Sequence, residues 1–543
     1  MRKAALVLLA TTALLFMAGC GSQPPTYYDP LDVSAPTALT VTDTPPTGVT
    51  VLFFQLSITG ATLTSQTVQN GALLSSANPI PFNVSQLQTE SALLDSTRVG
   101  WNHRYTTGTY TGLTVTFANP QLTIYNGTGS AIGTCANNTV CQLAPTTTPL
   151  TLNFSSTPFP ITLTADSPVA FKLDIHLNTI IQPDLTVNLA APNGVTLSQL
   201  PAPPAGGPIS ALGRLIGTVQ SVGANQFTLQ TPEGRTFLIY VNSSTAYNLP
   251  DDPYCPPGPH LSCPLVVPAV CSAENLFCLM AGEVVSATVG LQSDGTLLAT
   301  EVDYLQAVGQ QAVEGTIVGL STSGGNTIMD LILQAEPLST MSSTLPLGQH
   351  VSVIVPSTGV TYLIDWQSFT PPSWMTLSFA SASDLQVGQE VLVFVEGSVT
   401  TSNGSGTSAS TPVGPAPLAF TTNFITLEPS QITGTVEAVD ANSQSFTLQT
   451  LPAFFVPPSA SPGAPPTLNP VQILIATTTQ TNYEGLTPDD FSGVAVNDVV
   501  SVAGWLFKSA GAPLDCSGPS GCVPPTQVAA KAVLGRPGPT PLF

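Results

Sequence analysis

Hydrophobic and polar residues alternate with a period of two along most of the chain, which predicts β-strands with one buried face. The alternation is clear at residues 54–58, 113–117 and 171–177. Helical periodicity is nearly absent, and residues 85–94 are the best candidate for one short helix. We therefore expect an all-β fold that begins with an antiparallel β-sandwich over residues 37–200.

After a Pro- and Gly-rich linker at residues 201–213, the sequence repeats itself. The pattern of residues 217–230 returns with few changes at residues 434–449, and a more diverged copy starts at Gly315. Each copy holds five to six predicted short strands. Because such strands have to hide their edges, we expect small β-barrels, with an OB-like barrel as one candidate. The predicted barrels span residues 214–308, 312–428 and 431–535, and a tail follows at residues 536–543.

The first 20 residues have the pattern of an export signal. Arg2 and Lys3 precede an apolar run over residues 4–16, which is too short for a transmembrane helix. Met17-Ala18-Gly19-Cys20 then resembles the lipobox of bacterial lipoproteins, in which the cysteine is acylated, for example with palmitate, and becomes the mature N-terminus. An ordinary signal peptide that ends near a cysteine is the alternative.

The lipobox resemblance implies a protein held at the bacterial cell envelope by its lipid, with the membrane as one partner. Gly21 and Ser22, in place of an Asp, favour the outer membrane over the inner one. Residues 21–36 are polar and Pro-rich, and we interpret them as a tether between the lipid and the folded part.

Eight cysteines remain once Cys20 is set aside, an even number that favours disulfides in an oxidising compartment. Two isolated close pairs predict local bridges, whereas a middle group of four allows three pairings. A metal site built from the middle group, with His260 as the nearby imidazole, is disfavoured because the spacings are wider than those of zinc sites. The local bridges are Cys135–Cys141 and Cys516–Cys522, and the middle group is Cys255, Cys263, Cys271 and Cys278.

Charged residues are scarce and mostly acidic. They make up 8% of the chain, and 31 acids against 10 bases give a net charge of −21. Because contacts to phosphates need Lys and Arg, this balance predicts that nucleic acid is not a partner. The 52 prolines and 44 glycines could also indicate disorder, but an apolar content of 43% and the recurring strands favour a folded chain.

Two family resemblances rest on these patterns. Residues 40–45 and 49–58, then residues 108–115 and 171–175, resemble in order the opening, central and late strands of the bacterial lipoprotein domain of unknown function 4382. The three repeats resemble the bacterial domain of unknown function 5666, from which the middle copy departs most at residues 327–331. Both resemblances imply exported β modules and bring no known catalytic residue.

The densest cluster of functional side chains is Trp101, His103, Arg104 and Tyr105. It is either a hairpin rim packed by aromatic residues or a binding patch. In a binding patch the rings would stack on a sugar or peptide, and the guanidinium would supply hydrogen-bond donors. His176 lies in the polar register of its predicted strand, so we interpret it as a solvated residue.

Enzymatic chemistry finds little support in the sequence. There is no Gly-x-Ser-x-Gly nucleophile elbow, and the chain has only four histidines. The adjacent acids Asp251-Asp252 and Asp489-Asp490 lie beside prolines and are interpreted as turns, with glycosidase carboxylates or calcium ligands as alternatives. We therefore predict no catalytic residue, no metal and no cofactor.

Taken together, these patterns favour a non-enzymatic, lipid-anchored envelope protein. Its tandem β modules would carry structure or bind an envelope or extracellular polymer or protein. The alternative is an exported hydrolase that acts on polysaccharide or peptide, with acidic residues in the variable loops.

Overall fold

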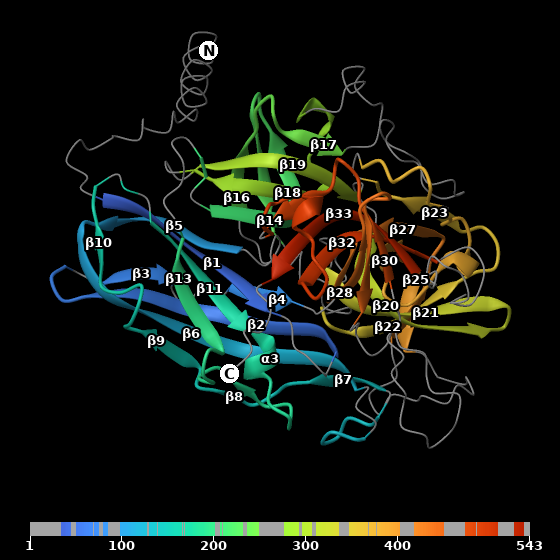
Figure 1. Cartoon of the computed structure of the whole chain (residues 1–543), viewed down its shortest axis with the longest axis horizontal. Coiled ribbons are helices and arrows are strands. Elements are labelled where there is room, and N and C mark those ends of the chain that lie inside the picture. Colours follow the sequence, from blue (N-terminus) through green and yellow to red (C-terminus); the bar gives the residue numbers. More distant parts are fainter. Residues whose placement is uncertain are drawn as a thin grey trace, which may run out of the picture.

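The structure is a computed structural model (Figure 1). Almost all of its regular structure is β-strand, as predicted, and the described helix is one turn, α3 (Leu177–Ile180). No helix of the described part is long and apolar enough to cross a membrane. The described residues are 34–536 apart from residues 45–49, 69, 75–79, 85–97, 127–129, 138, 166, 168, 201–206, 209, 232–235, 249–275, 293–295, 307–310, 336–346, 367–368, 376, 402–417, 450–472, 485 and 509–525.

The N-terminal unit is a sandwich of two sheets. Its larger sheet is built around two long antiparallel neighbours, β2 (Thr50–Ser65) and β6 (Gly108–Asn126). The order is β10-β6-β2-β3, with β4 also on β2 and with β7 and β9 on β6. The shorter strands are β3 (Gly71–Leu74), β4 (Ile80–Val84), β7 (Thr139–Leu143), β9 (Thr151–Phe154) and β10 (Ile161–Leu163).

The smaller sheet has the order β13-β11-β1-β5. Strands β1 and β11 run parallel, with Leu39 opposite Phe171, which differs from the expected antiparallel sandwich. Alternation reveals which face of a strand is buried, but it carries no information on the direction of the neighbouring strand. The strands are β1 (Ser34–Thr44), β5 (Arg98–Thr106), β11 (Val169–His176) and β13 (Val195–Gln199), and the short β8 (Thr147–Thr148) and β12 (Val187–Asn188) pair with each other.

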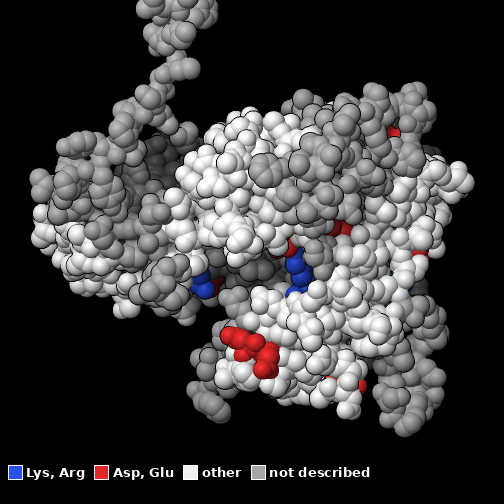
Figure 2. Space-filling model, turned by 90° about the horizontal axis from the view of Figure 1, so that it is seen from above, with Lys and Arg blue, Asp and Glu red and all other residues white. Residues whose placement is uncertain are grey.

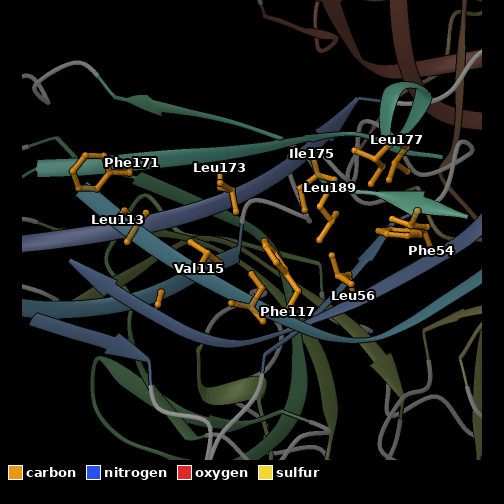
Figure 3. Close-up of a cluster of buried hydrophobic side chains, with 14 of the residues drawn as sticks. Phe54, Leu56, Leu113, Val115, Phe117, Phe171, Leu173, Ile175, Leu177 and Leu189 are labelled. Atoms are coloured by element: carbon orange, nitrogen blue, oxygen red, sulfur yellow. The ribbon is translucent and has the colours of Figure 1, made fainter. Parts of the chain in front are cut away.

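The core of the sandwich fills the space between its two sheets (Figure 3). Phe54 and Leu56 of β2 and Phe117 of β6 face Leu173 and Ile175 of β11, and each of these side chains is at most 1% exposed. Burial of an apolar side chain of this size contributes roughly 1.5–3 kcal/mol to stability. The apolar positions that predict the strands therefore also hold the two sheets together.

Each repeat folds into a small five-stranded barrel. In the first barrel the order is β16-β15-β14-β18-β19, and a parallel pair between β16 and β19 closes the ring. The third barrel has the order β30-β29-β28-β32-β33 and closes through the parallel pair β30–β33. Because the first strand pairs with the second and fourth, and the third with the fifth, the barrels are OB-like. Each closing pair is parallel, whereas the other neighbouring strands in these two rings are antiparallel.

The strands of these two barrels occur in the same order and have similar lengths, and each barrel includes one extra short strand. The first barrel consists of β14 (Ser210–Val222), β15 (Gln226–Gln230), β16 (Thr236–Tyr240), β17 (Ala246–Asn248), β18 (Val284–Leu291) and β19 (Leu297–Gln306). The third consists of β28 (Ser430–Asp440), β29 (Ser445–Gln449), β30 (Ile473–Ala476), β31 (Asn482–Glu484), β32 (Val499–Lys508) and β33 (Thr526–Arg536).

The second barrel has the same order with an interrupted fifth strand. Its third strand pairs in parallel with β26, its fourth strand pairs with β27, and Thr422 and Asn423 separate β26 from β27. In every barrel an extra short strand (β17, β23 or β31) lies parallel to the fifth strand. The strands are β20 (Ala312–Ser323), β21 (Asn326–Ala335), β22 (His350–Val355), β23 (Thr361–Ile364), β24 (Glu390–Phe394), β25 (Glu396–Thr401), β26 (Leu418–Thr421) and β27 (Phe424–Glu428).

One turn before the fourth strand recurs in all three barrels. In the first barrel Gly282 has a φ of +94°, a conformation that favours glycine, and Glu283 Oε2 accepts a hydrogen bond from Met280 N at 2.8 Å. The backbone of Val219 in the first strand bonds to both Gly282 and Glu283, so the turn ties the fourth strand to the first. In the second barrel the equivalent acceptor is Gln389, which bonds to Gln386 N, and in the third it is Asp498, which bonds to Ala495 N; both distances are 2.8 Å. A short 3-10 helix precedes each turn: η2 (Leu276–Cys278), η3 (Ala382–Asp384) and η5 (Phe491–Gly493).

The units pack directly against one another. Gln334 Nε2 of the second barrel donates a hydrogen bond to the backbone oxygen of Leu52 in the sandwich at 2.7 Å. Gln389 Nε2 of the second barrel donates to the backbone oxygen of Leu506 in the third barrel at 2.9 Å. Both glutamines are at most 5% exposed, so these contacts are buried and the second barrel is held on two sides.

Candidate functional site

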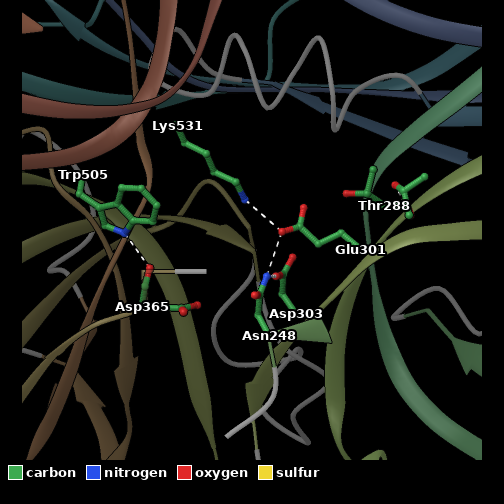
Figure 4. A network of polar contacts seen from close by, with 8 residues as sticks. Asn248, Thr288, Glu301, Asp303, Asp365, Trp505 and Lys531 are labelled. Carbon is green, nitrogen blue, oxygen red and sulfur yellow. Dashed lines mark hydrogen bonds and ion pairs between the residues drawn. The ribbon is translucent and has the colours of Figure 1, made fainter. Parts of the chain in front are cut away.

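Five polar residues gather where the three barrels meet (Figure 4). Glu301 and Asp303 lie on the same face of β19 because they are two residues apart on a strand. Asn248 of β17 is the register partner of Asp303 on the parallel neighbour. Lys531 comes from β33 of the third barrel, and Asp365 directly follows β23 of the second. We call these five residues the junction cluster.

Asn248 bridges the two carboxylates of the first barrel. Its Nδ2 donates hydrogen bonds to Glu301 Oε1 at 2.9 Å and to Asp303 Oδ1 at 2.5 Å. Lys531 Nζ lies 3.4 Å from the same Glu301 oxygen, across a sequence separation of 230 residues. This partly exposed ion pair is worth at most about 1 kcal/mol, but it joins the first barrel to the third.

Asp303 is the most unusual titratable group of the junction cluster. It is 6% exposed. Burial raises the pKa of Asp303 to about 7, the Glu301 carboxylate adds to the rise, and the Lys531 ammonium opposes it. On β18, Ser286 lies directly opposite Asp303; it is 2% exposed, and within the described part of the chain its hydroxyl has no hydrogen-bond partner. The arrangement can hold a proton near neutral pH.

An aromatic contact lies beside the junction cluster and joins the second and third barrels. Trp505 Nε1 donates a hydrogen bond to the backbone oxygen of Asp365 at 2.7 Å (Figure 4). The centroid of the Trp505 ring is 5.1 Å from that of Trp366 and 5.1 Å from that of Phe369. Because Trp505 is fully buried, this indole is the apolar anchor of the contact.

Charges are sparse on the molecular face drawn in Figure 2, and basic and acidic atoms lie next to each other near its centre. Among the described residues, no group of three His, Cys, Asp or Glu side chains is placed to hold a metal ion. The junction cluster itself offers a carboxyl that can take up a proton and an ion pair that joins two barrels.

The predicted binding patch lies on β5, an edge strand of the smaller sandwich sheet. β5 pairs with β1, and His103 is the register partner of Thr37. The side chains of Trp101, His103, Arg104 and Tyr105 are outside what the structure describes. The patch stays a prediction.

One predicted disulfide, Cys135–Cys141, is confirmed by the structure. Cys278 lies half-buried in η2, and the other three cysteines of its group are outside the described residues. Further predictions outside that range are the lipidated Cys20, His260, the helix at residues 85–94, and Cys255, Cys263, Cys271, Cys516 and Cys522.

The remaining candidates are dispersed over the molecule. His176 is half-buried on the polar face of β11, where its Nε2 lies 3.7 Å from Asp174 Oδ2. Asp489 and Asp490 accept hydrogen bonds from nearby backbone N–H groups at 2.9 and 2.8 Å, as turn residues do. Asp251-Asp252 lies outside the described residues.

Reasoning from the sequence missed the junction cluster, although a signal was present. Glu301 and Asp303 place two negative charges on one face of a strand, and like charges of this kind require compensation. The chain has no Lys or Arg between residues 236 and 507. The compensating cation therefore had to come from a distant segment, and Lys531 is one of three bases after that gap.

Comparison with known proteins gives matches among solved structures but none among curated proteins. No curated protein matches the chain. A deletion mutant of the single-stranded DNA binding protein from Thermus aquaticus matches with 14% identity and a TM-score of 0.14, covering 43% of this chain and 96% of that chain. The expectation that nucleic acid is not a partner, which rested on net charge and on the scarcity of Lys and Arg, is contradicted by the presence of this DNA-binding neighbour and is withdrawn. A TM-score this low gives no argument for the fold or for binding.

The second finding concerns the first barrel. The model of the family described as "Domain of unknown function (DUF5666)" matches residues 216–303. This range ends at Asp303 and so includes both carboxylates that Asn248 bridges. The resemblance of the sandwich to family 4382 and that of the other two repeats to DUF5666 remain predictions, whereas residues 216–303 match the DUF5666 model.

Proposed function

We propose that this chain is a non-enzymatic, lipid-anchored protein of the bacterial cell envelope whose β modules bind an envelope or extracellular polymer or protein, or carry structure. The observation that carries this proposal is that charged and polar side chains form contacts between the β modules. Lys531 pairs with Glu301 between barrels, and Gln334 and Gln389 bond across unit boundaries. Side chains that could serve chemistry here instead fix the units relative to one another.

Fixed units suit the presentation of a binding surface. A binding surface gains affinity when its parts are already held in place, since less conformational freedom is lost on binding. The predicted lipidation site, Cys20, and the predicted tether at residues 21–36 support a position at the envelope. Gly21 and Ser22 favour the outer membrane.

The anchor is tested by expressing the whole protein in a bacterium supplied with a clickable palmitate analogue. We expect label on the protein in the membrane fraction, and we expect Cys20→Ser to abolish the label and move the protein out of that fraction. Ser22→Ala is the matched control and should keep both. Labelling of the Cys20→Ser variant would contradict the anchor.

Binding is tested by co-sedimentation of the whole protein with peptidoglycan, with lipopolysaccharide and with extracellular polysaccharide. Retention on one polymer that Trp101→Ala reduces at least tenfold would support the predicted patch on β5. Trp374→Ala is the control, because Trp374 is 45% exposed on the second barrel. Turnover of a glycan or peptide panel that Asp251→Asn or Asp252→Asn abolishes would overturn the non-enzymatic proposal in favour of an exported hydrolase.

A further inference from the structure

The junction cluster has more acids than the charge beside it can compensate. Glu301 and Asp365 both act on Asp303, and among the described residues Lys531 is the cation that faces Asp303 and Glu301. If the three carboxylates were all ionised, three negative charges would lie near the one positive charge of Lys531, and one of them, on Asp303, would be buried. Buried charges without compensation are expensive, and carboxyl groups take up protons to avoid them.

Asp303 is the carboxyl that is best placed to take the proton. It lies on the outward face of the first barrel, because its neighbour Val302 is part of the barrel core. On that face Asn248 of β17 bonds to Asp303 directly, and Lys531 of the third barrel lies close enough to act on its charge. Ser286, directly opposite on β18, has a buried hydroxyl oxygen that could accept a hydrogen bond from a protonated Asp303.

We propose that the contact between the first and third barrels is a proton-dependent clamp, in which a proton held at Asp303 keeps β19 and β33 in contact and its loss favours their separation. The groups that face this proton are Glu301 on the same strand, Asn248 on β17, Ser286 on β18, Lys531 on β33 and Asp365 after β23.

The direction of the effect follows from two opposing influences on Asp303. Separation of the barrels would remove Lys531, which raises the affinity of Asp303 for its proton, and would admit water, which lowers that affinity. Burial is the larger influence, and the pKa of Asp303 in the closed state is about 7 against an ordinary value of 3.8. The closed state therefore binds the proton more tightly than the open state, and acid favours closure.

The clamp is tested on the whole protein by hydrogen–deuterium exchange at pH 5 to 9, corrected for the intrinsic pH dependence of exchange. In the wild type, the opening constant reported by amides of β19 and β33 should rise up to about tenfold per pH unit from pH 5 to 7 and level off above. Amides of β2 and β6 in the sandwich serve as the internal reference and should not follow this profile.

Three variants separate the clamp from general destabilisation. Asp303→Asn mimics the protonated side chain and should flatten the profile at the protected level. Ser286→Ala removes the proposed acceptor and should shift the midpoint of the profile to lower pH. Asp440→Asn removes an exposed carboxyl of the third barrel and should leave the profile unchanged. A flat profile in the wild type, or an unchanged profile in Asp303→Asn, would overturn the proposal.

If Asp303→Asn does not fold, the wild type still decides the question. Carbon-13 NMR of labelled Asp carboxyl groups should show one resonance that titrates near pH 7 together with amide shifts in β33. Titration of every Asp carboxyl below pH 5 would overturn the clamp. None of these measurements depends on the lipid anchor or on a binding partner, so the clamp and the proposed function can fail separately.

Discussion

Trp505 Nε1 donates a hydrogen bond to the backbone oxygen of Asp365 at 2.7 Å, and this bond joins the third barrel to the second. Its donor belongs to a fully buried indole that also packs against Trp366 and Phe369. One side chain therefore supplies both the polar and the apolar part of the contact.

Replacing Trp505 separates these two parts. Trp505→Phe keeps an aromatic ring but leaves the Asp365 oxygen without its donor, and should lower the free energy of unfolding by about 1–2 kcal/mol. Trp505→Ala also removes the packing and should cost about 3–5 kcal/mol. Urea unfolding measures both, and Trp374→Ala, at an exposed position, should change stability by less than about 0.5 kcal/mol. Equal urea midpoints for Trp505→Phe and Trp505→Ala would refute this division of the contact into a polar and an apolar part.

Gly348 controls the approach of the second barrel to the sandwich. Its backbone oxygen accepts a hydrogen bond from Thr123 Oγ1 at 2.8 Å, and a Cβ at this position would collide with the ring of Phe53. Gly348→Ala should destabilise the protein by about 2–4 kcal/mol. Gly359→Ala, at a similar φ of +78° but in open space, should cost only about 1 kcal/mol of backbone strain. A similar shift in melting temperature for both variants would show that the collision with Phe53 is unimportant.

Glu283 should make stability depend on pH. Burial raises the pKa of Glu283 to about 7, and the hydrogen bond from Met280 N opposes the rise. Because the folded state holds its proton to higher pH than the unfolded state, stability should fall as pH rises from about 4.5 to 7 and stay constant above. Gln389 fills the equivalent turn position in the second barrel with an amide.

Glu283→Gln should therefore keep the turn and remove this part of the pH dependence. At pH 8 we expect the variant to be more stable than the wild type by about 1–2 kcal/mol, a value reduced for solvent screening. Thermal unfolding at pH 5 and pH 8 measures the effect. Asp498→Asn is the matched change in the third barrel. A variant less stable than the wild type at pH 8 would mean that the turn needs a carboxylate.

The Cys135–Cys141 bridge should stabilise the sandwich by about 2 kcal/mol, as expected for a short closed loop. Replacing both cysteines with Ala should lower the unfolding midpoint of the sandwich. In the wild type, mass spectrometry after denaturing alkylation should find both thiols labelled only when the protein has been reduced. Labelling of either cysteine without reduction would exclude the bridge.

The sequence was sufficient to predict the strands and the repeat but not the way in which each ring closes. Residues 171–177 alternate because one face of β11 meets the sandwich core, and that alternation can be read locally. The parallel pairs β16–β19 and β30–β33 join strands separated by long loops, and nothing in either strand encodes the direction of its partner.

The junction cluster could not be predicted from the sequence for a similar reason. Each of Glu301, Asp303 and Lys531 alone resembles a polar residue on the exposed face of a strand, and only packing between barrels brings Lys531 to Glu301. The absence of bases between residues 236 and 507 indicated that a partner had to come from far away in the sequence. It did not identify that partner, because the position of the third barrel against the first depends on contacts such as Trp505 with Asp365.

The pairing of Lys531 with Glu301 also sets an order of events during synthesis. A ribosome completes β19 some 230 residues before it reaches Lys531, so the first barrel emerges with its acidic face still exposed to water. The same late strand, β33, is needed to close the third barrel through β30. Strand β33 therefore both closes the third barrel and supplies the cation for the acidic face of the first. A chain interrupted before β33 would leave an open barrel and an uncovered acidic face for proteases to recognise.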